Sequence, residues 1–95
     1  NNDITYKDIS SLELLKEVNK LLISKKFAVN NIDSVILAQD PKIEPFKKKM
    51  AENISGILGL GEEAVSIKAT TTERLGSIGR LEGIASYATA SIIEK

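Results

Sequence analysis

Cysteine and histidine are both missing from this sequence of 95 residues. Without cysteine, the chain has neither a disulfide framework nor a thiolate metal site, which is typical of a cytoplasmic protein. Without histidine, these residues alone supply no imidazole base, no Ser-His triad and no histidine-bound zinc. Any chemistry that the chain performs by itself must use hydroxyl, carboxylate, ammonium or main-chain groups.

Net charge and long apolar runs are missing as well. Thirteen basic residues balance thirteen acidic ones, so no overall field attracts nucleic acid or an anionic membrane, and neither is expected as a partner. No apolar run reaches the length of about 18 residues that would indicate a membrane span, and the polar start from Asn1 to Lys7 does not resemble a signal peptide. Because the first residue is not methionine, we expect a processed, truncated or partial chain.

Aromatic residues are scarce. They make up 4% of the chain, whereas apolar residues in total make up 42%, which predicts one domain over residues 1–95 with a modest, aliphatic core. A small domain buries a lower fraction of its surface than a large one. We therefore expect a partner subunit to complete the core.

The first half of the chain predicts a helix followed by a strand. Ser10 and Glu13 have the spacing of a capping box, which satisfies unpaired amides at a helix start. An amphipathic helix is predicted from Ser11 to about Lys25, with an apolar stripe at Leu14, Leu15, Val18, Leu21 and Leu22. After a break at Val29 to Asn31, the β-branched run from Ile32 to Ala38 predicts a buried strand.

The second half predicts another helix and another strand. Pro45 suits a first helical turn, and the helix is predicted to end near Gly59. Its apolar stripe, expected to lie in the core, consists of Phe46, Met50, Ile54, Ile57 and Leu58. Alternation of apolar and polar residues predicts a strand from Val65 to Ala69, whereas the periodicity of Gly83 to Lys95 does not separate strand from helix. This order of elements indicates an α+β or α/β fold.

Two motifs resemble ligand sites but have simpler explanations. The sequence GLGEEA at residues 59–64 fits a dinucleotide-binding fingerprint, yet it follows a helix where that motif must follow a strand. A helix stop and turn is therefore favoured. The lysines at positions 47–49 could contact phosphates, but successive helical residues point around the axis and do not converge on one ligand. A solvent-exposed helix face is favoured for them.

Three threonines and a glutamate, Thr70 to Glu73, follow the second predicted strand. Hydroxyl groups and main-chain amides at a strand end can direct several donors at one phosphate. A carboxylate beside them adds a hard oxygen ligand, and magnesium is usually held by one or two carboxylates together with substrate phosphates. The stretch fits a metal-diphosphate site or, equally well, a polar turn whose threonines cap local amides.

A polar loop, Ala38 to Ile43, leaves the first predicted strand in a similar way. Pro41 stiffens this loop, so that its main-chain groups can read the edge of a base, and Lys42 offers a mobile positive charge to a phosphate. We expect the two strand ends to line one cleft, although an ordinary strand-to-helix connection also explains the loop.

Three segments carry a resemblance to a known family. AQDPKIEPF, IKATTTERLG and GRLEGIA, in this order, resemble the 2-C-methyl-D-erythritol 2,4-cyclodiphosphate synthase family of the non-mevalonate isoprenoid pathway. The resemblance covers nearly the whole chain and includes the leading helix with SSLELLKEV. It implies an α+β fold with a mixed sheet packed against helices, whose last segment is a strand. It also implies a homotrimer with sheets around a central axis and active sites between subunits.

The activity implied by the resemblance is a cyclisation. The 2-phosphate of 4-diphosphocytidyl-2-C-methyl-D-erythritol 2-phosphate attacks the β-phosphorus and expels CMP, so the enzyme is a phosphorus-oxygen lyase. In this match Thr71 stabilises the transition state, Glu73 binds magnesium or manganese, and Lys42 lies near the phosphates. The substrate-binding residues implied by the match are Asn1, Asn2, Asp3, Ala38, Gln39, Asp40, Pro41, Lys42, Ile43, Glu44, Ala69, Thr70, Thr71, Thr72, Glu73, Ser77 and Arg80.

Other parts of the family site are missing or changed. Family members bind zinc through an aspartate and two histidines upstream of the matching region, so zinc is expected in the complete protein only and no zinc ligand is expected in this chain. Asn1 to Asp3 match the end of a lid over the methylerythritol part. Ser77 and Leu81 depart from the family sequence LGFTGRGEG beside Arg80, which in the family can meet an isoprenoid diphosphate. A structural ion pair is the alternative role for Arg80 and Glu82.

The chain is therefore interpreted as the C-terminal part of a cyclodiphosphate synthase domain, expected to be inactive without the zinc region. A non-catalytic, trimeric nucleotide-binding domain is the alternative interpretation. A third is a small interaction module in which the threonine stretch is only a turn.

Overall fold

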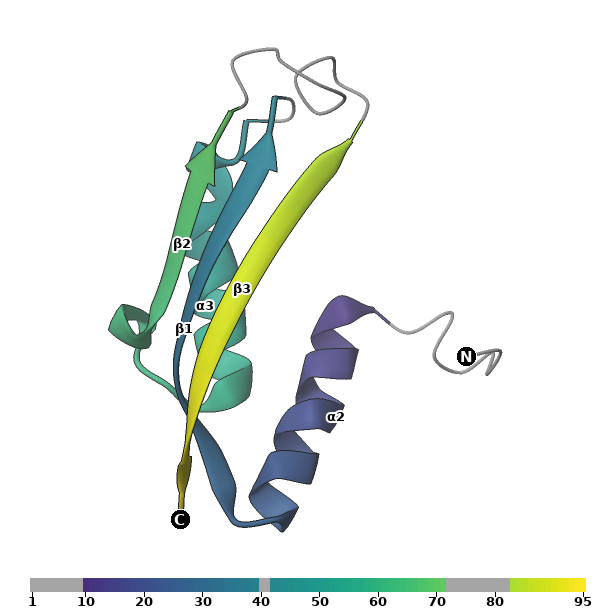
Figure 1. Cartoon of the computed structure of the whole chain (residues 1–95), viewed down its shortest axis with the longest axis vertical. Coiled ribbons are helices and arrows are strands. Elements are labelled where there is room, and N and C mark those ends of the chain that lie inside the picture. The colour runs from purple at the N-terminus through teal and green to yellow at the C-terminus, as the bar shows by residue number, and fades with distance from the viewer. Residues whose placement is uncertain (1–9, 40–41, 72–82) are drawn as a thin grey trace.

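The computed structural model of the chain describes residues 10–39, 42–71 and 83–95. Three strands form one sheet in the order β2-β1-β3, in which β1 is parallel to β2 and antiparallel to β3. Helix α3 lies behind β1 and β2, and helix α2 packs against α3 and β1 (Figure 1). The α+β fold with a mixed sheet against helices is therefore confirmed, while the trimer expected with it stays a prediction.

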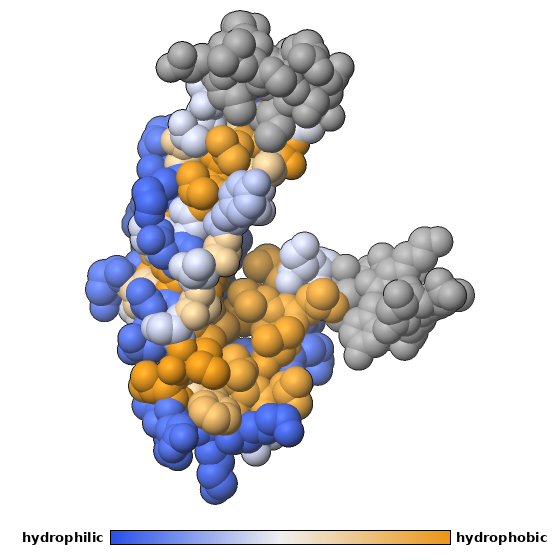
Figure 2. All heavy atoms as spheres, in the orientation of Figure 1, coloured by the Kyte–Doolittle hydropathy of each residue, from blue (hydrophilic) through white to orange (hydrophobic). Residues whose placement is uncertain are grey.

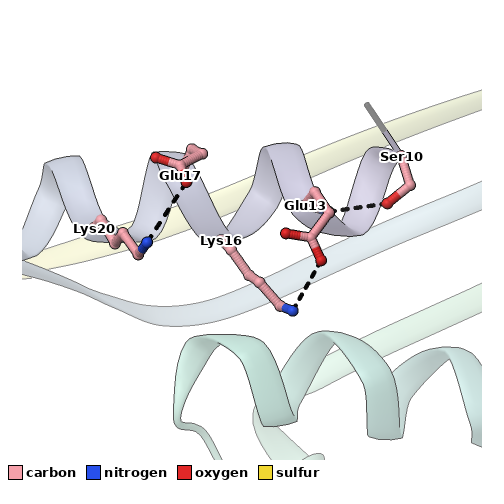
Figure 3. A network of polar contacts seen from close by, with 5 residues as sticks. All are labelled: Ser10, Glu13, Lys16, Glu17 and Lys20. Carbon is pink, nitrogen blue, oxygen red and sulfur yellow. Dashed lines mark hydrogen bonds and ion pairs between the residues drawn. The ribbon is translucent and has the colours of Figure 1, made fainter. Parts of the chain in front are cut away.

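Helix α2 (Ser11–Ser24) begins where the capping spacing predicted. The Ser10 hydroxyl accepts a hydrogen bond from the Glu13 N–H at 3.2 Å, which satisfies an amide that has no partner inside the helix. Figure 3 shows this cap and the two exposed ion pairs that follow it, Glu13 with Lys16 and Glu17 with Lys20. Each pair of this kind stabilises a helix by only about 0.2–0.5 kcal/mol, so the pairs add little to α2, which has no buried residue in this chain.

Strand β1 (Phe27–Ala38) begins five residues earlier than predicted, and the break expected at Val29 to Asn31 is wrong. The pairing of β1 with β3 shifts between Val29 and Asn31, which is a β-bulge. Asn30 Nδ2 donates to Ser91 Oγ at 3.3 Å, and Ser91 Oγ donates to Asn31 Oδ1. Polar residues that suggested a loop therefore lie inside a strand, because a bulge accommodates them and β3 supplies their partner.

Helix α3 (Lys47–Leu58) follows a single 3-10 turn, η1 (Glu44–Phe46), and ends as predicted at Gly59. Gly59 has a φ of 70°, and the N–H of Leu60 donates to the Ser55 carbonyl at 2.9 Å, which closes a left-handed helix cap. The GLGEEA segment is thus confirmed as a helix stop. A second 3-10 turn, η2 (Glu62–Ala64), leads into strand β2 (Val65–Thr70).

The core of the described residues lies between α3 and the β1–β2 pair. Its buried cluster consists of Ile36, Ala38, Val65 and Ile67, with Ile43, Met50, Ala51, Ile54 and Leu60 packed against it. Burial of a side chain of this size stabilises the fold by about 1.5–3 kcal/mol. Met50 thus contributes to the core as predicted, but the same prediction is wrong for Phe46, which is 57% exposed. Phe46 belongs to η1, whose turn is tighter than an α-helix, and so the helical stripe does not extend to it.

Strand β3 (Ile84–Glu94) settles the one segment that periodicity left open. It pairs with β1 along nearly its whole length, from Ala38 opposite Ile84 to Phe27 opposite Glu94. Its small residues alternate without a helical stripe, and its strand state follows from this pairing. Most of β3 is exposed, including Tyr87 at 66%.

Candidate functional site

The carboxyl ends of β1 and β2 lie at the same edge of the sheet because the two strands are parallel (Figure 1). Leu37 pairs with Thr70 in the register, so the loop after β1 and the threonines after β2 leave the sheet side by side. Ligands commonly bind beyond the carboxyl ends of parallel strands. The prediction that the two strand ends meet is confirmed.

A cavity of about 110 Å³ is formed where the two strand ends meet. The residues that line it are Ala38, Lys42, Ile43, Glu44, Ala69, Thr70 and Thr71. All of them belong to the substrate site predicted from the sequence, and they come from two distant segments of the chain. Ligand sites usually measure about 300–1,000 Å³, so this cavity by itself accommodates a fragment such as a phosphate or a base edge.

Hydroxyl and ammonium groups give the cavity its donors. Thr70 Oγ1 donates to the Thr71 carbonyl at 3.3 Å, which is long for a hydrogen bond between two oxygen atoms. Rotation of this hydroxyl toward a phosphate would therefore break only a weak hydrogen bond. The side chain of Lys42, an exposed residue of the lining, adds a positive charge on a flexible stem.

One residue of the cavity lining, Glu44, is acidic. Glu44 is the first residue of η1, and Lys47 holds it from the next turn, with Nζ at 2.9 Å from Oε2 and 3.2 Å from Oε1. Lys47 does not itself line the cavity. The sequence placed Lys47 on a solvated helix face and gave no sign of this pair.

The remaining predicted residues fall into two groups. Gln39 is half-buried after the end of β1 and does not line the cavity. The others lie outside the described residues, namely Asn1, Asn2, Asp3, Asp40, Pro41, Thr72, Glu73, Ser77 and Arg80. Their roles stay predictions, including that of Glu73 as the magnesium or manganese ligand. Across residues 10–39, 42–71 and 83–95, no three acidic side chains gather into a group that could hold a metal ion.

A second cavity, of about 210 Å³, lies on the sheet face that α3 does not cover, between Asp33, Lys68 and the β3 residues Tyr87 to Thr89. Lys68 donates a hydrogen bond to Asp33 across the β1–β2 pair. This bond, assisted by the charge of Lys68, holds the pKa of the Asp33 carboxyl below its ordinary value of 3.8. Sequence reasoning missed this pair, because alternation put Lys68 on the solvent side but could not name its partner.

Comparison with known proteins identifies the family. The model of the YgbB family matches residues 1–93. The chain belongs to the YgbB family. Curated relatives named 2-C-methyl-D-erythritol 2,4-cyclodiphosphate synthase include that of Clostridium botulinum, which is 50% identical over 93 residues. The match covers 98% of this chain and 59% of that relative. The resemblance inferred from the three motifs is thus confirmed, and this YgbB chain spans somewhat more than half the length of the curated relatives it matches.

Solved structures give the same result. The Plasmodium vivax 2C-methyl-D-erythritol 2,4-cyclodiphosphate synthase matches with a TM-score of 0.87 and 37% identity, over 90% of this YgbB chain and 57% of that one. The Plasmodium falciparum IspF, solved as a CDP complex, matches with a TM-score of 0.85 and 34% identity, over 90% of this chain and 55% of that one. Both structures share the fold described above. Among the described residues of this chain, neither helix has the length and apolarity needed to cross a membrane.

Proposed function

We propose that this chain is part of an enzyme that converts 4-diphosphocytidyl-2-C-methyl-D-erythritol 2-phosphate into 2-C-methyl-D-erythritol 2,4-cyclodiphosphate and CMP. An oxygen of the 2-phosphate forms a bond to the β-phosphorus, and the bond from that phosphorus to the CMP oxygen breaks. CMP leaves with the electron pair. The enzyme is a phosphorus-oxygen lyase of non-mevalonate isoprenoid biosynthesis.

One observation carries this proposal: two of the three segments that carry the family resemblance line a single cavity at the carboxyl edge of β1 and β2. The relatives at about 50% identity bear the synthase name, and a homologue was solved with CDP bound. A fragment-sized cavity lined by residues with hydroxyl, ammonium and main-chain groups fits one part of a cytidine diphosphate, a phosphate or the edge of the base, because it offers donors for phosphate and main-chain edges for a base.

In this proposal, different residues bind different parts of the substrate. The loop from Ala38 to Glu44 binds the cytidine side through main-chain groups, and Lys42 approaches the phosphates. Thr70 and Thr71 donate to the diphosphate, and Thr71 supports the charge that builds up on the phosphoryl oxygens in the transition state. Phosphoryl transfer needs positioning and electrostatic stabilisation of this kind more than covalent catalysis.

Magnesium or manganese is the metal proposed for this half of the site. Apart from the Lys42 ammonium and the main-chain amides, the polar groups of the lining residues are oxygen atoms. Oxygen ligands suit a hard cation, which the substrate phosphates would also bind. Glu73, two residues beyond Thr71 in the sequence, would hold the ion. When bound, the ion neutralises phosphate charge as the β-phosphorus is attacked.

We further propose a cytoplasmic homotrimer with active sites between subunits. The sheet face turned away from α3 supports this assembly, because Tyr87 and Ile93 of β3 are exposed there at 66% and 42%. Monomeric proteins seldom leave a sheet face with such side chains uncovered. Neither nucleic acid nor a membrane is proposed as a partner.

A second candidate is a nucleotide-binding domain without turnover. The absence of histidine from the chain favours it, because the resemblance implies zinc held by two histidines outside the matching region. In this case the chain binds CDP with magnesium, and no cyclisation follows even when the remainder of the domain is present.

CMP release by the complete domain tests the enzyme proposal. We expect metal-dependent CMP release from the diphosphocytidyl substrate, and we expect Glu73→Gln to slow it at limiting magnesium. An unchanged rate in this variant would remove the metal role from Glu73. A complete domain that binds CDP but releases no CMP would instead support the second candidate.

Calorimetric titration of the 95-residue chain with CDP and magnesium tests the binding site alone. We expect saturable binding, with NMR shift changes at Thr70, Thr71 and Lys42. If neither heat nor shift changes appear, the threonine stretch is only a turn and the chain is an interaction module.

A further inference from the structure

Among the described residues that line the cavity, Glu44 is the one whose side chain carries charge of the same sign as the proposed ligand. A cytidine diphosphate carries negative charge, and two like charges repel over several ångströms unless a counter-charge lies nearby. The Glu44 side chain is 71% exposed, so water screens part of this repulsion, but the residue is part of the cavity lining. The site needs a way to neutralise this residue.

Lys47 provides the neutralising charge. Its Nζ lies within hydrogen-bond distance of both oxygen atoms of Glu44, at 2.9 and 3.2 Å. With a side chain only 32% exposed, Lys47 is also held more firmly than its neighbour Lys48, which is 79% exposed and lies 3.7 Å from Glu62. Of the lysines at positions 47 and 48, therefore, only Lys47 pairs with a residue that lines the cavity.

Local structure explains why the two charges meet. Residues three apart lie almost one above the other in a 3-10 turn, and η1 with Pro45 in its first turn is such an element. Glu44 starts this turn and Lys47 follows it, so their side chains share one face. The order acidic then basic also suits the dipole of the turn.

We propose that Lys47 is a positioning residue that neutralises the Glu44 carboxylate and so makes the rim of the cavity acceptable to a diphosphate. The inference rests on the proposed function, because it takes the ligand to be a cytidine diphosphate. Glu44 contributes main-chain groups to the base, while its side chain is held by Lys47. Lys47 acts through Glu44 and does not touch the ligand.

A double-mutant cycle on CDP affinity tests this role. The 95-residue chain is titrated with CDP and magnesium at low ionic strength as wild type, Lys47→Met, Glu44→Gln and the double variant. Lys47→Met exposes the Glu44 charge, and we expect affinity to fall by about three- to ten-fold, as Coulomb repulsion across a few ångströms of partly screened solvent allows. Glu44→Gln removes the side-chain charge and keeps the main-chain groups assigned to the base, so its affinity is the reference for the double variant.

Rescue in the double variant decides between two roles of Lys47. If Lys47 masks Glu44, then Glu44→Gln with Lys47→Met regains the affinity of Glu44→Gln alone. If the double variant binds as weakly as Lys47→Met, Lys47 attracts the phosphates directly and the proposal is overturned. If Lys47 had only a structural role, the thermal midpoint and the affinity would fall together in both variants that lack it. Masking predicts instead that the double variant regains affinity while its midpoint stays close to that of Lys47→Met.

Lys48→Met is the matched control, since it removes the same charge from the next residue of α3. It should bind CDP like the wild type. Equal losses in Lys47→Met and Lys48→Met would overturn the inference, because a general charge effect would explain both. Failure of the proposed function looks different: then the wild type itself binds no CDP, and both ideas fall together.

Discussion

The two neighbours of β1 in the sheet are covered very differently. On the β2 side, α3 closes over the sheet, and the buried apolar residues all belong to β1, β2 or α3 among those the structure describes. On the β3 side, large apolar residues stay in contact with solvent, including Ile84 at 55% and Ile92 at 47%. Figure 2 shows apolar side chains gathered on a hollowed face over α2 and the lower part of the sheet.

This difference shows where stability and the site coincide. The cavity lies at the carboxyl edge of β1 and β2, directly beyond the buried cluster; Ala38 belongs to both, and Ile43 lines the cavity and packs against the cluster. Rigid strands therefore hold the groups that are proposed to bind phosphate. Strand β3 contributes hydrogen bonds to β1 but hardly any buried area in this chain.

Truncation of one isoleucine on each side gives the largest expected contrast. Ile67, on β2, is 9% exposed, so Ile67→Ala should lower the free energy of unfolding by about 2–4 kcal/mol. Ile92→Ala, on β3, removes the same atoms from a residue that is 47% exposed and should cost less than about 1 kcal/mol. Urea denaturation measures both. Equal losses would mean that β3 is covered in solution, and the contrast between the two sides would disappear.

A pair of glycines tests the helix that covers the β2 side. Gly59 has a φ of 70°, so Gly59→Ala should destabilise the chain by about 1 kcal/mol, although its Cβ would meet no atom within 4 Å. Gly56→Ala lies inside α3 in equally open space and should stabilise the chain by about 0.5–1 kcal/mol. Thermal midpoints report both changes. Shifts of the same sign would show that the end of α3 does not depend on its left-handed cap.

The parts of the fold that could be predicted depend on neighbours in the sequence. The cap at Ser10 and the stop at Gly59 are local chemistry, and both were located from a few adjacent residues. Asn30 misled the prediction, because the bulge that accommodates it is defined by Ser91, which lies sixty-one residues away. The state of β3 likewise follows from its pairing with β1 and not from its own pattern.

The same distinction between local and long-range determinants applies to the candidate site. Lys42 and Thr70 were identified because each comes after a predicted strand, and parallel pairing of β1 with β2 then brings them to one cavity. The partners of charged groups were not predicted. Lys47 holds Glu44 because a 3-10 turn replaces the expected first turn of the helix, and Lys68 reaches Asp33 only once the β1–β2 register is known.

Two asparagine hydrogen bonds, one to α3 and one to β3, extend the comparison. Asn19 of α2 donates to the Ile57 carbonyl of α3 at 3.2 Å in a half-buried position, so Asn19→Ala should cost about 1 kcal/mol of unfolding free energy. Asn30 donates to Ser91 of β3 at an exposed position, and Asn30→Ala should cost less than about 0.5 kcal/mol. Chemical denaturation of both variants measures the difference. A larger loss at Asn30 would mean that the bulge fixes the register of β3 more strongly than exposure suggests.

The smallest expected effect concerns pH and the open sheet face. The folded pKa of Asp33 lies below 3.8, so its pairing with Lys68 contributes stability above that pH and loses it as the pH falls through the lower folded value. Asp33→Asn should therefore flatten the decline of the thermal midpoint below pH 3.8, and Lys68→Met should flatten it equally. An unchanged slope in either variant would show that the pair does not persist in solution.

The size of this pH effect also bears on the comparison between the two sides. Both side chains are more than half exposed in the single chain, so water screens their attraction and only a slight change of slope is expected. A proposed trimer would cover this face and remove that water, and the pH effect would then grow with protein concentration, because burial strengthens the interaction between paired charges. Midpoints that depend on concentration below pH 3.8 in the wild type, but not in Asp33→Asn, would therefore indicate that subunits meet on this face.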